Sequence, residues 1–202
     1  MPKISDEQRA ARRAQILEAA WRCFQKNGLH ATTMDDIIKT SDLSAGAVYS
    51  YYASKEDIIF SAVTASLSGL RERLEPILKE RPIARPDIFI GQIAEAIAGF
   101  TAREGYDLKR IALLGWSEAQ RNDRLRLTMQ DFYLAFREML IGMAEVWKEA
   151  GHLQQAASAS DVAKAVLSGI LGFVVQSAIV GGVEPSDLAG GFGDLIKADS
   201  DE

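Results

Sequence analysis

Residues 32–59 read TTMDDIIKTSDLSAGAVYSYYASKEDII, and this stretch predicts three successive helix starts. Thr33, Ser44 and Ser54 stand at positions where a side-chain oxygen typically caps a helix N-terminus. Apolar residues between these caps recur at helical spacing, and Leu43 lies in the turn that joins the first two segments. Two short helices with an inward apolar face and a connecting turn of about three or four residues predict a helix-turn-helix.

The residue types in this stretch suit contact with duplex DNA. A recognition helix enters the major groove by its N-terminal end, so the small residues 45–47 would allow close approach there. Hydroxyl and backbone N–H groups at helix starts suit phosphate oxygens, and Tyr49 and Tyr51 carry hydroxyls able to reach a phosphate or a base edge. Lys55 would add a cation beside the DNA backbone. Each residue type also has an ordinary structural role, and it is their order and spacing together that favours DNA.

Helical periodicity extends over most of the chain, and no strand-like alternation of useful length interrupts it. Ser5 followed by Gln8 predicts the start of a first helix, and Gly28 suits the left-handed position at its end. The clearest pattern is a run of apolar residues from Leu125 to Val146, spaced alternately by four and three residues. The sequence therefore predicts an all-α protein of about nine helices without a sheet.

Composition places the chain among globular proteins and argues against most catalytic sites. The 202 residues are 48% hydrophobic and 25% charged, which fits one domain or a small domain followed by a larger one. Cys23 is the one cysteine, and His30 and His152 are the two histidines, so neither an internal disulfide nor a His/Cys zinc site is expected. No Ser/His/Asp or Cys/His pairing has plausible spacing, and no glycine loop cradles a phosphate. We therefore expect no catalytic residues, no metal and no cofactor.

Charge is unevenly distributed along the chain. The net charge is −5, yet residues 1–55 hold eight basic and six acidic side chains. A mildly positive head on an acidic body is compatible with a nucleic-acid-binding end.

The N-terminus carries charges where a secretory signal needs an apolar core, so a cytoplasmic location is expected. Residues 165–183 are uncharged and approach the length of a membrane span, but their glycine, serine and glutamine residues favour a helix buried inside protein.

The stretch from about Arg9 to Val63 resembles the DNA-binding domain of TetR-family transcriptional regulators. The likeness covers roughly a quarter of the chain and combines three helices in a fixed register rather than one short motif. It rests on ILEAA at 16–20, Phe24 before Asn27-Gly28, ATTMDDI at 31–37, SAGAVY at 44–49 and SKED at 54–57.

The resemblance implies a ligand-released repressor that binds double-stranded operator DNA, of palindromic sequence, as a homodimer. Residues 1–55 would form the helix-turn-helix DNA-binding domain, and residues 56–202 a helical domain for ligand binding and dimerisation. The family's dimer contacts fall on about 161–181 and 185–197, which would explain the uncharged segment without a membrane. The reading helix spans about 45–51. The family's DNA-contact positions fall on Thr33, Ser44, Ala45, Gly46, Tyr49, Ser50, Tyr51 and Lys55.

Two positions depart from the family pattern. Asp42 stands in the turn where the family usually has glycine, and aspartate tolerates a left-handed conformation better than most residues. Ala45 occupies a position often filled by lysine or arginine. Since Ala47 and Ser50 are also small, the reading helix carries no cation able to pair bidentately with guanine. Sequence discrimination would then rest on tyrosine hydroxyls, methyl contacts to thymine and DNA shape.

The second domain is expected, from the resemblance, to bind a small hydrophobic or amphipathic effector. Its aromatic and methionine side chains suit such a cavity, but they suit a solid helical core as well, so both interpretations stay open. The polar partners expected for a ligand are Tyr106 and Gln176. A helical enzyme and a membrane-associated small-molecule-binding protein are the alternatives to a regulator. The predicted ligand-binding residues are Phe89, Phe100, Tyr106, Trp116, Phe132, Phe136, Met139, Trp147, Phe173 and Gln176.

Overall fold

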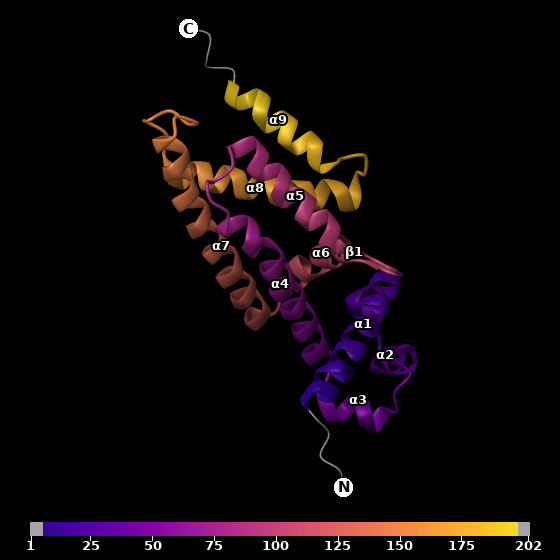
Figure 1. The fold of residues 1–202 in the computed structure, drawn as a ribbon. Coiled ribbons are helices and arrows are strands. Elements are labelled where there is room, and N and C mark those ends of the chain that lie inside the picture. The colour runs from indigo at the N-terminus through magenta and orange to yellow at the C-terminus, as the bar shows by residue number, and fades with distance from the viewer. Residues whose placement is uncertain (1–5, 198–202) are drawn as a thin grey trace.

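The computed structural model describes residues 6–197, and almost all of this range is helical. Within it, nine helices and one pair of short strands follow each other along the chain, which confirms the predicted all-α fold class. Figure 1 shows α1, α2 and α3 grouped at one end of the molecule and α9 at the opposite end, with α4 leading from the first group into the body. Ser5, predicted to start the first helix, lies outside the described residues.

The first helices begin and end at positions that the sequence marks. The hydroxyls of Thr33, Ser44 and Ser54 each accept a hydrogen bond from a backbone N–H in the following turn, so the three predicted caps are confirmed. Gly28 interrupts helical geometry near the end of the first helix with a φ of 77°, a left-handed value that glycine adopts without steric cost. These elements are α1 (Asp6–Ala31), α2 (Met34–Ser41), α3 (Ala45–Tyr51) and α4 (Lys55–Lys79).

One hydrophobic cluster holds α1, α2, α3 and the beginning of α4 together. Phe24, Ile37, Val48 and Ile58, one from each helix, are at most 1% exposed. Burial of a large apolar side chain contributes roughly 1.5–3 kcal/mol to the stability of the fold, so this shared cluster holds the inner side of α3 in place. The cluster extends past residue 55, which means that the first turns of α4 belong structurally to the N-terminal unit.

The remaining helices form a second core. Helix α5 packs along α9 and α7 packs along α8, while α6 contacts both α8 and α1. At the centre of this core the indole N–H of Trp147 donates to the carbonyl of Ala84 at 2.8 Å, and its ring meets Phe89 edge to face at 5.5 Å. The elements of the body are α5 (Pro86–Thr101), β1 (Ala102–Arg103), β2 (Tyr106–Asp107), α6 (Leu108–Glu118), α7 (Asp123–Glu149), α8 (Ala159–Ile179) and α9 (Pro185–Lys197).

A small hairpin between α5 and α6 corrects the expectation of a chain without any sheet. Strands β1 and β2 pair antiparallel, with Ala102 opposite Asp107 and Arg103 opposite Tyr106. Gly105 turns the chain with a φ of 86°. Each strand has two residues, which is too short to show the alternation of polar and apolar residues that predicts a strand.

Candidate nucleic-acid interface

The exposed face of α3 is set by two anchors on its other side. Val48 is fully buried, and Tyr52, directly after the helix, is 7% exposed. Ser44 fixes the start of the helix, because its Oγ accepts a hydrogen bond from the N–H of Ala47 at 3.2 Å. A short helix held in this way presents a fixed outer face of small and hydroxyl-bearing residues. The residues of α3 that face solvent are Ala45, Gly46, Tyr49 and Ser50.

A reciprocal cap fixes the start of α2. Thr33 Oγ1 accepts from the N–H of Asp36 at 3.1 Å, and the N–H of Thr33 donates to Asp36 Oδ2 at 2.9 Å. Hydrogen bonds from the backbone and side chain of Thr33 lower the pKa of the Asp36 carboxyl, with smaller help from nearby lysines. Thr33 itself is exposed, so its hydroxyl stands at the surface while it caps the helix.

The turn between α2 and α3 has the geometry that its sequence predicts. Asp42 adopts a left-handed conformation with a φ of 55°, which confirms the role expected for it in place of glycine. The side chain of Gln15 in α1 donates to the carbonyl of Ser41 at 2.7 Å and ties the end of α2 to α1. The angle between the two short helices is therefore fixed both by the turn and by the helix behind it.

Lys55 makes hydrogen bonds to backbone carbonyls of its own chain. Its Nζ donates to the carbonyls of Leu29, His30 and Thr32 at 3.0, 2.9 and 2.9 Å. An ammonium group has three donors, so all of them are occupied in this structure. Lys55 thus fastens the start of α4 to the segment that follows Gly28, and its contact with a DNA phosphate stays a prediction.

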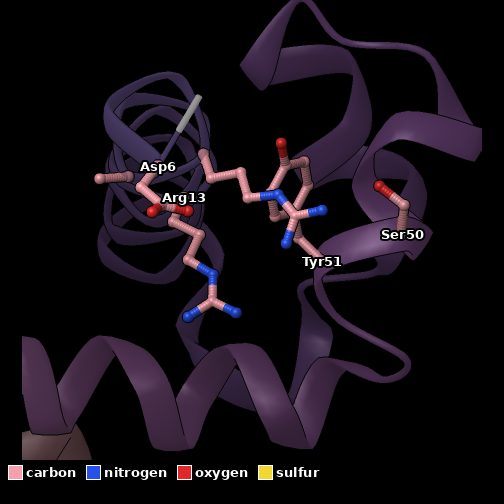
Figure 2. A pocket seen from close by; sticks show the side chains of 6 residues that line it. Asp6, Arg13, Ser50 and Tyr51 are labelled. Carbon is pink, nitrogen blue, oxygen red and sulfur yellow. The ribbon is translucent and has the colours of Figure 1, made fainter. Parts of the chain in front are cut away.

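The three tyrosines near the end of α3 have different surroundings. Tyr49 is 50% exposed and points away from the core. Tyr51 is half-buried and packs against the hydrophobic cluster, and Figure 2 shows it with Ser50 across a hollow from Asp6 and Arg13 of α1. Burial raises the pKa of Tyr52, against the opposing effects of the Arg13 charge and a hydrogen bond with Ser61. Tyr49 is the most exposed of these three tyrosines, so its hydroxyl is the one best placed to contact DNA.

Sequence reasoning missed a group of cations beside α3. Arg9, Arg12 and Arg13 of α1 are exposed, and they line two hollows whose other wall includes Ser50 and Tyr51. The spacing of three and four residues already placed these arginines on neighbouring positions of one helix surface. Their proximity to α3 depends on how α1 packs, which the local pattern does not specify.

The residues predicted to bind a ligand do not gather in one place. Phe89, Phe136, Trp147 and Phe173 belong to the main core of the body and are at most 5% exposed. Met139, by contrast, is 41% exposed. Gln176 is also exposed. The structure therefore divides the predicted set into buried core residues and surface residues, and its role in ligand binding stays a prediction.

Of the remaining predicted ligand residues, Tyr106 and Phe100 lie beside the N-terminal unit, whereas Trp116 and Phe132 lie beside Tyr133 of α7. Tyr106 stacks on Trp21 of α1 with ring centroids 5.6 Å apart, and Phe100 packs against the small apolar cluster that contains Tyr106. The indole N–H of Trp116 donates to the hydroxyl of Tyr133 at 2.8 Å. Burial raises the pKa of Tyr133, while its hydrogen bond with Trp116 acts in the opposite direction. Phe132 is half-buried beside Tyr133, with its ring edge to face at 5.5 Å.

Three contacts join α1 to α6 and the hairpin before it. The side chain of Gln25 accepts a hydrogen bond from the backbone N–H of Asp107, close to the stacked rings of Trp21 and Tyr106. At the far end of α6, His30 Nε2 lies 3.7 Å from Glu118 Oε2. Both ends of α6 are therefore attached to the N-terminal unit.

Helix α8 is the one described helix with the length and apolar composition of a membrane span, and 22% of its apolar window is buried within the chain. Large apolar side chains are exposed at its end and in α9, with Ile179, Val180 and Leu195 at 68%, 76% and 76%. Across residues 6–197, no group of three or more His, Cys, Asp or Glu side chains is placed to hold a metal ion.

Comparison with known proteins gives consistent matches. Residues 16–62 match the model of a family described as bacterial regulatory proteins, tetR family. The chain is 25% identical over 190 residues to an HTH-type transcriptional regulator of Bacillus subtilis, covering 94% of this chain and 90% of that protein. It is 29% identical over 141 residues to an HTH-type transcriptional repressor of Mycobacterium tuberculosis, covering 64% of this chain and 73% of that protein.

Similarity to a solved structure extends over both units. The regulator FadR of Bacillus subtilis, solved in complex with stearoyl-CoA, superposes with a TM-score of 0.72 at 18% identity. The superposition covers 92% of this chain and 97% of that one. This similarity shows a shared fold.

Proposed function

Because this chain belongs to the TetR family of bacterial transcriptional regulators, we propose that it acts as a ligand-released repressor that binds a palindromic operator as a homodimer. The observation that carries this proposal is the anchoring of α3. Val48 and Tyr52 fix its inner side, while Ala45 and Gly46 at its start leave room for close approach to base edges. Among the relatives, the protein of Mycobacterium tuberculosis is named a repressor, which supports repression as the output.

Dimerisation through residues 161–181 and 185–197 is supported by the apolar surface that α8 and α9 leave exposed. A Cβ on Gly169 would meet the ring of Phe192 at 2.7 Å, so this glycine lets α9 cross α8 closely within one chain. Gly172 has no atom within 4 Å of that position, so it offers room for a helix of a second copy. A two-fold dimer would set two reading helices about one DNA turn apart, ~34 Å, as a palindromic operator requires.

Release from DNA would follow from the contacts between α1 and α6. Since α6 is attached to α1 near Gln25 and near His30, a shift of α6 would turn the whole N-terminal unit. A ligand acts on this equilibrium by binding the non-DNA conformation more tightly, and a hundredfold preference supplies ~2.7 kcal/mol. That amount is enough to lower operator occupancy substantially.

The proposed effector is a small hydrophobic or amphipathic compound. Helix α6 carries Trp116, whose partner Tyr133 lies on α7, so a ligand near this pair would touch the helix that is attached to α1. The complex of FadR with stearoyl-CoA shows that an amphipathic compound binds that protein of similar fold. A cytoplasmic regulator without catalytic activity is the role that these features favour over a helical enzyme.

DNA retardation by the purified protein tests the proposed function. The wild-type chain should run as a dimer of twice its 22.1 kDa mass without detergent, and it should retard DNA from upstream of its own gene. Tyr49→Ala should weaken this binding about tenfold or more while the dimer stays intact. Leu127→Ala, at an equally exposed apolar residue of α7, is the matched control. Persistent dependence on detergent would favour the membrane alternative, and equal affinity of wild type and Tyr49→Ala would remove Tyr49 from the interface.

A further inference from the structure

Three arginines in the first turns of α1 have no assigned role. Arg9, Arg12 and Arg13 are exposed, and none of them takes part in an ion pair between residues 6 and 197. One donor of Arg12 is used by the side chain of Gln15, at 2.9 Å. A guanidinium has five donors, so Arg12 keeps four for another partner.

The packing of α1 brings these cations to the end of α3. Arg9 and Arg13 line one hollow with Ser50 and Tyr51, and Figure 2 shows Arg13 on the α1 side of this hollow. Arg12 lines a neighbouring hollow that again includes Ser50 and Tyr51, together with Ala47 of α3. The arginines therefore lie beside the C-terminal end of the reading helix, next to Ser50 and Tyr51.

Two other cations of the N-terminal unit are already used by groups of the chain itself. The reading helix itself carries no lysine or arginine. Lys55 spends its three donors on backbone carbonyls, and Arg22 is paired with Glu18 at 2.8 Å. A protein that binds DNA through a neutral helix still needs cations beside that helix, because phosphate contacts supply most of the sequence-independent affinity.

We propose that Arg9, Arg12 and Arg13 form a phosphate-binding edge, which contacts the DNA backbone bordering the groove at the C-terminal end of α3. This inference rests on the proposed DNA-binding function and names further residues that carry it. The planar guanidinium group matches a phosphate bidentately, which suits arginine to this position better than lysine. The arginines set the strength and salt dependence of binding, while Tyr49 and the small residues of α3 face the bases.

Asp6 places a negative charge beside the arginines of the phosphate-binding edge. Its carboxylate lines the same hollow as Arg9 and Arg13, and it lies in the first turn of α1, where an acidic side chain interacts favourably with the helix dipole. A carboxylate at this place repels a DNA phosphate. Replacement of Asp6 should therefore act on DNA binding with the opposite sign to replacement of the arginines.

The test measures how binding of the full-length protein changes with salt concentration. The probe is a mixed-sequence duplex of about 40 base pairs, because a phosphate contact does not depend on sequence. The slope of log affinity against log salt is negative, and each lost phosphate contact reduces its magnitude by ~0.9. A two-fold dimer loses each contact twice. Arg9→Gln combined with Arg13→Gln should therefore reduce the magnitude of the slope by roughly 3.6 in a dimer, with an unchanged thermal unfolding midpoint.

Two further variants make the result decisive. Arg121→Gln removes the same charge from an exposed position between α6 and α7, and it should leave the slope unchanged. Asp6→Asn should raise affinity by roughly threefold to fivefold per subunit at ~0.15 M salt, and therefore by about tenfold or more in a dimer. A slope in the double variant equal to wild type would overturn the inference, and so would an equal loss in Arg121→Gln. A wild-type protein that binds no duplex would overturn the proposed function itself.

Discussion

The contacts of the N-terminal unit follow from local sequence patterns, whereas those of the helical body do not. In the N-terminal unit, helix caps, a left-handed turn and a buried anchor lie within about 25 residues, and each makes the local contact that its residue type predicts. In the body, the residues predicted to bind one ligand are divided between a buried core, the contact with α1 and the surface, where Met139 and Gln176 lie. A surface built from local hydrogen bonds is readable from sequence, whereas a cavity depends on how distant helices pack.

The difference also concerns the use of apolar surface. The N-terminal unit packs its buried apolar residues into one cluster, and the exposed face of α3 consists of small and hydroxyl-bearing residues. Helices α8 and α9 instead leave large apolar side chains exposed. The first unit thus buries its core within one chain, and the exposed apolar surface of the second supports the proposed dimer interface.

The largest expected effect distinguishes core from cavity in the body. Trp147→Ala removes a side chain that is 1% exposed and hydrogen-bonded to Ala84, so the free energy of unfolding should fall by ~3–5 kcal/mol in the absence of ligand. Met139→Ala, at a 41% exposed position, should change it by less than ~0.5 kcal/mol. Urea unfolding of both variants measures this difference. A stable Trp147→Ala protein with weakened ligand binding would instead place Trp147 in a cavity wall.

The next effect concerns the partner surface of α8. Val180→Glu places a charge on a residue that is 76% exposed in the single chain, so the chain should stay folded while its dimer dissociates at least about a hundredfold more readily. Light scattering over a dilution series measures the change. Leu127→Glu, with the same charge change at a 50% exposed residue of α7, should stay dimeric. A Val180→Glu protein that remains a dimer would exclude this end of α8 from the interface.

Replacement of Lys55 should have an intermediate effect on stability, and it separates a role within the N-terminal unit from a contact with DNA. Lys55→Ala removes three hydrogen bonds to backbone carbonyls, and the free energy of unfolding should fall by ~1–2 kcal/mol. If Lys55 acts only within the chain, the folded variant keeps the salt slope of wild type. Chemical unfolding and the salt dependence of DNA binding measure the two roles separately. An unchanged stability together with a reduced slope would assign Lys55 to a phosphate.

The smallest effect is the pH dependence of the α2 cap. The pKa of Asp36 is lowered in the folded chain, so its stabilising effect is present above the unfolded pKa of ~3.9. That effect is lost as the pH falls through the folded pKa. Asp36→Asn should therefore have a lower thermal midpoint than wild type near neutral pH, and the two should converge in acid. Asp35→Asn, one residue earlier in the same turn, is the control, and a gap independent of pH would contradict the assignment.

The sequence predicted the part of the site that depends on local chemistry. The cap at Thr33 and the turn at Asp42 were predictable because each makes its contacts within a few residues. The three partners of Lys55 lie 23 to 26 residues away, so its internal role needed the packed structure. The arginines of α1 came beside Ser50 for the same reason. The hairpin between α5 and α6 was missed because two-residue strands leave no periodic signal.

The central claim is that α3 lies in the major groove of DNA, once in each subunit of a symmetric dimer. Selection of binding sites from random duplexes by the wild-type protein at low salt tests it most directly. The expected result is an enriched inverted repeat whose half-sites are centred about 10 base pairs apart, or a multiple of that spacing, one helical turn being ~34 Å. A folded, dimeric protein that enriches no sequence and retains no duplex at low ionic strength would contradict the account.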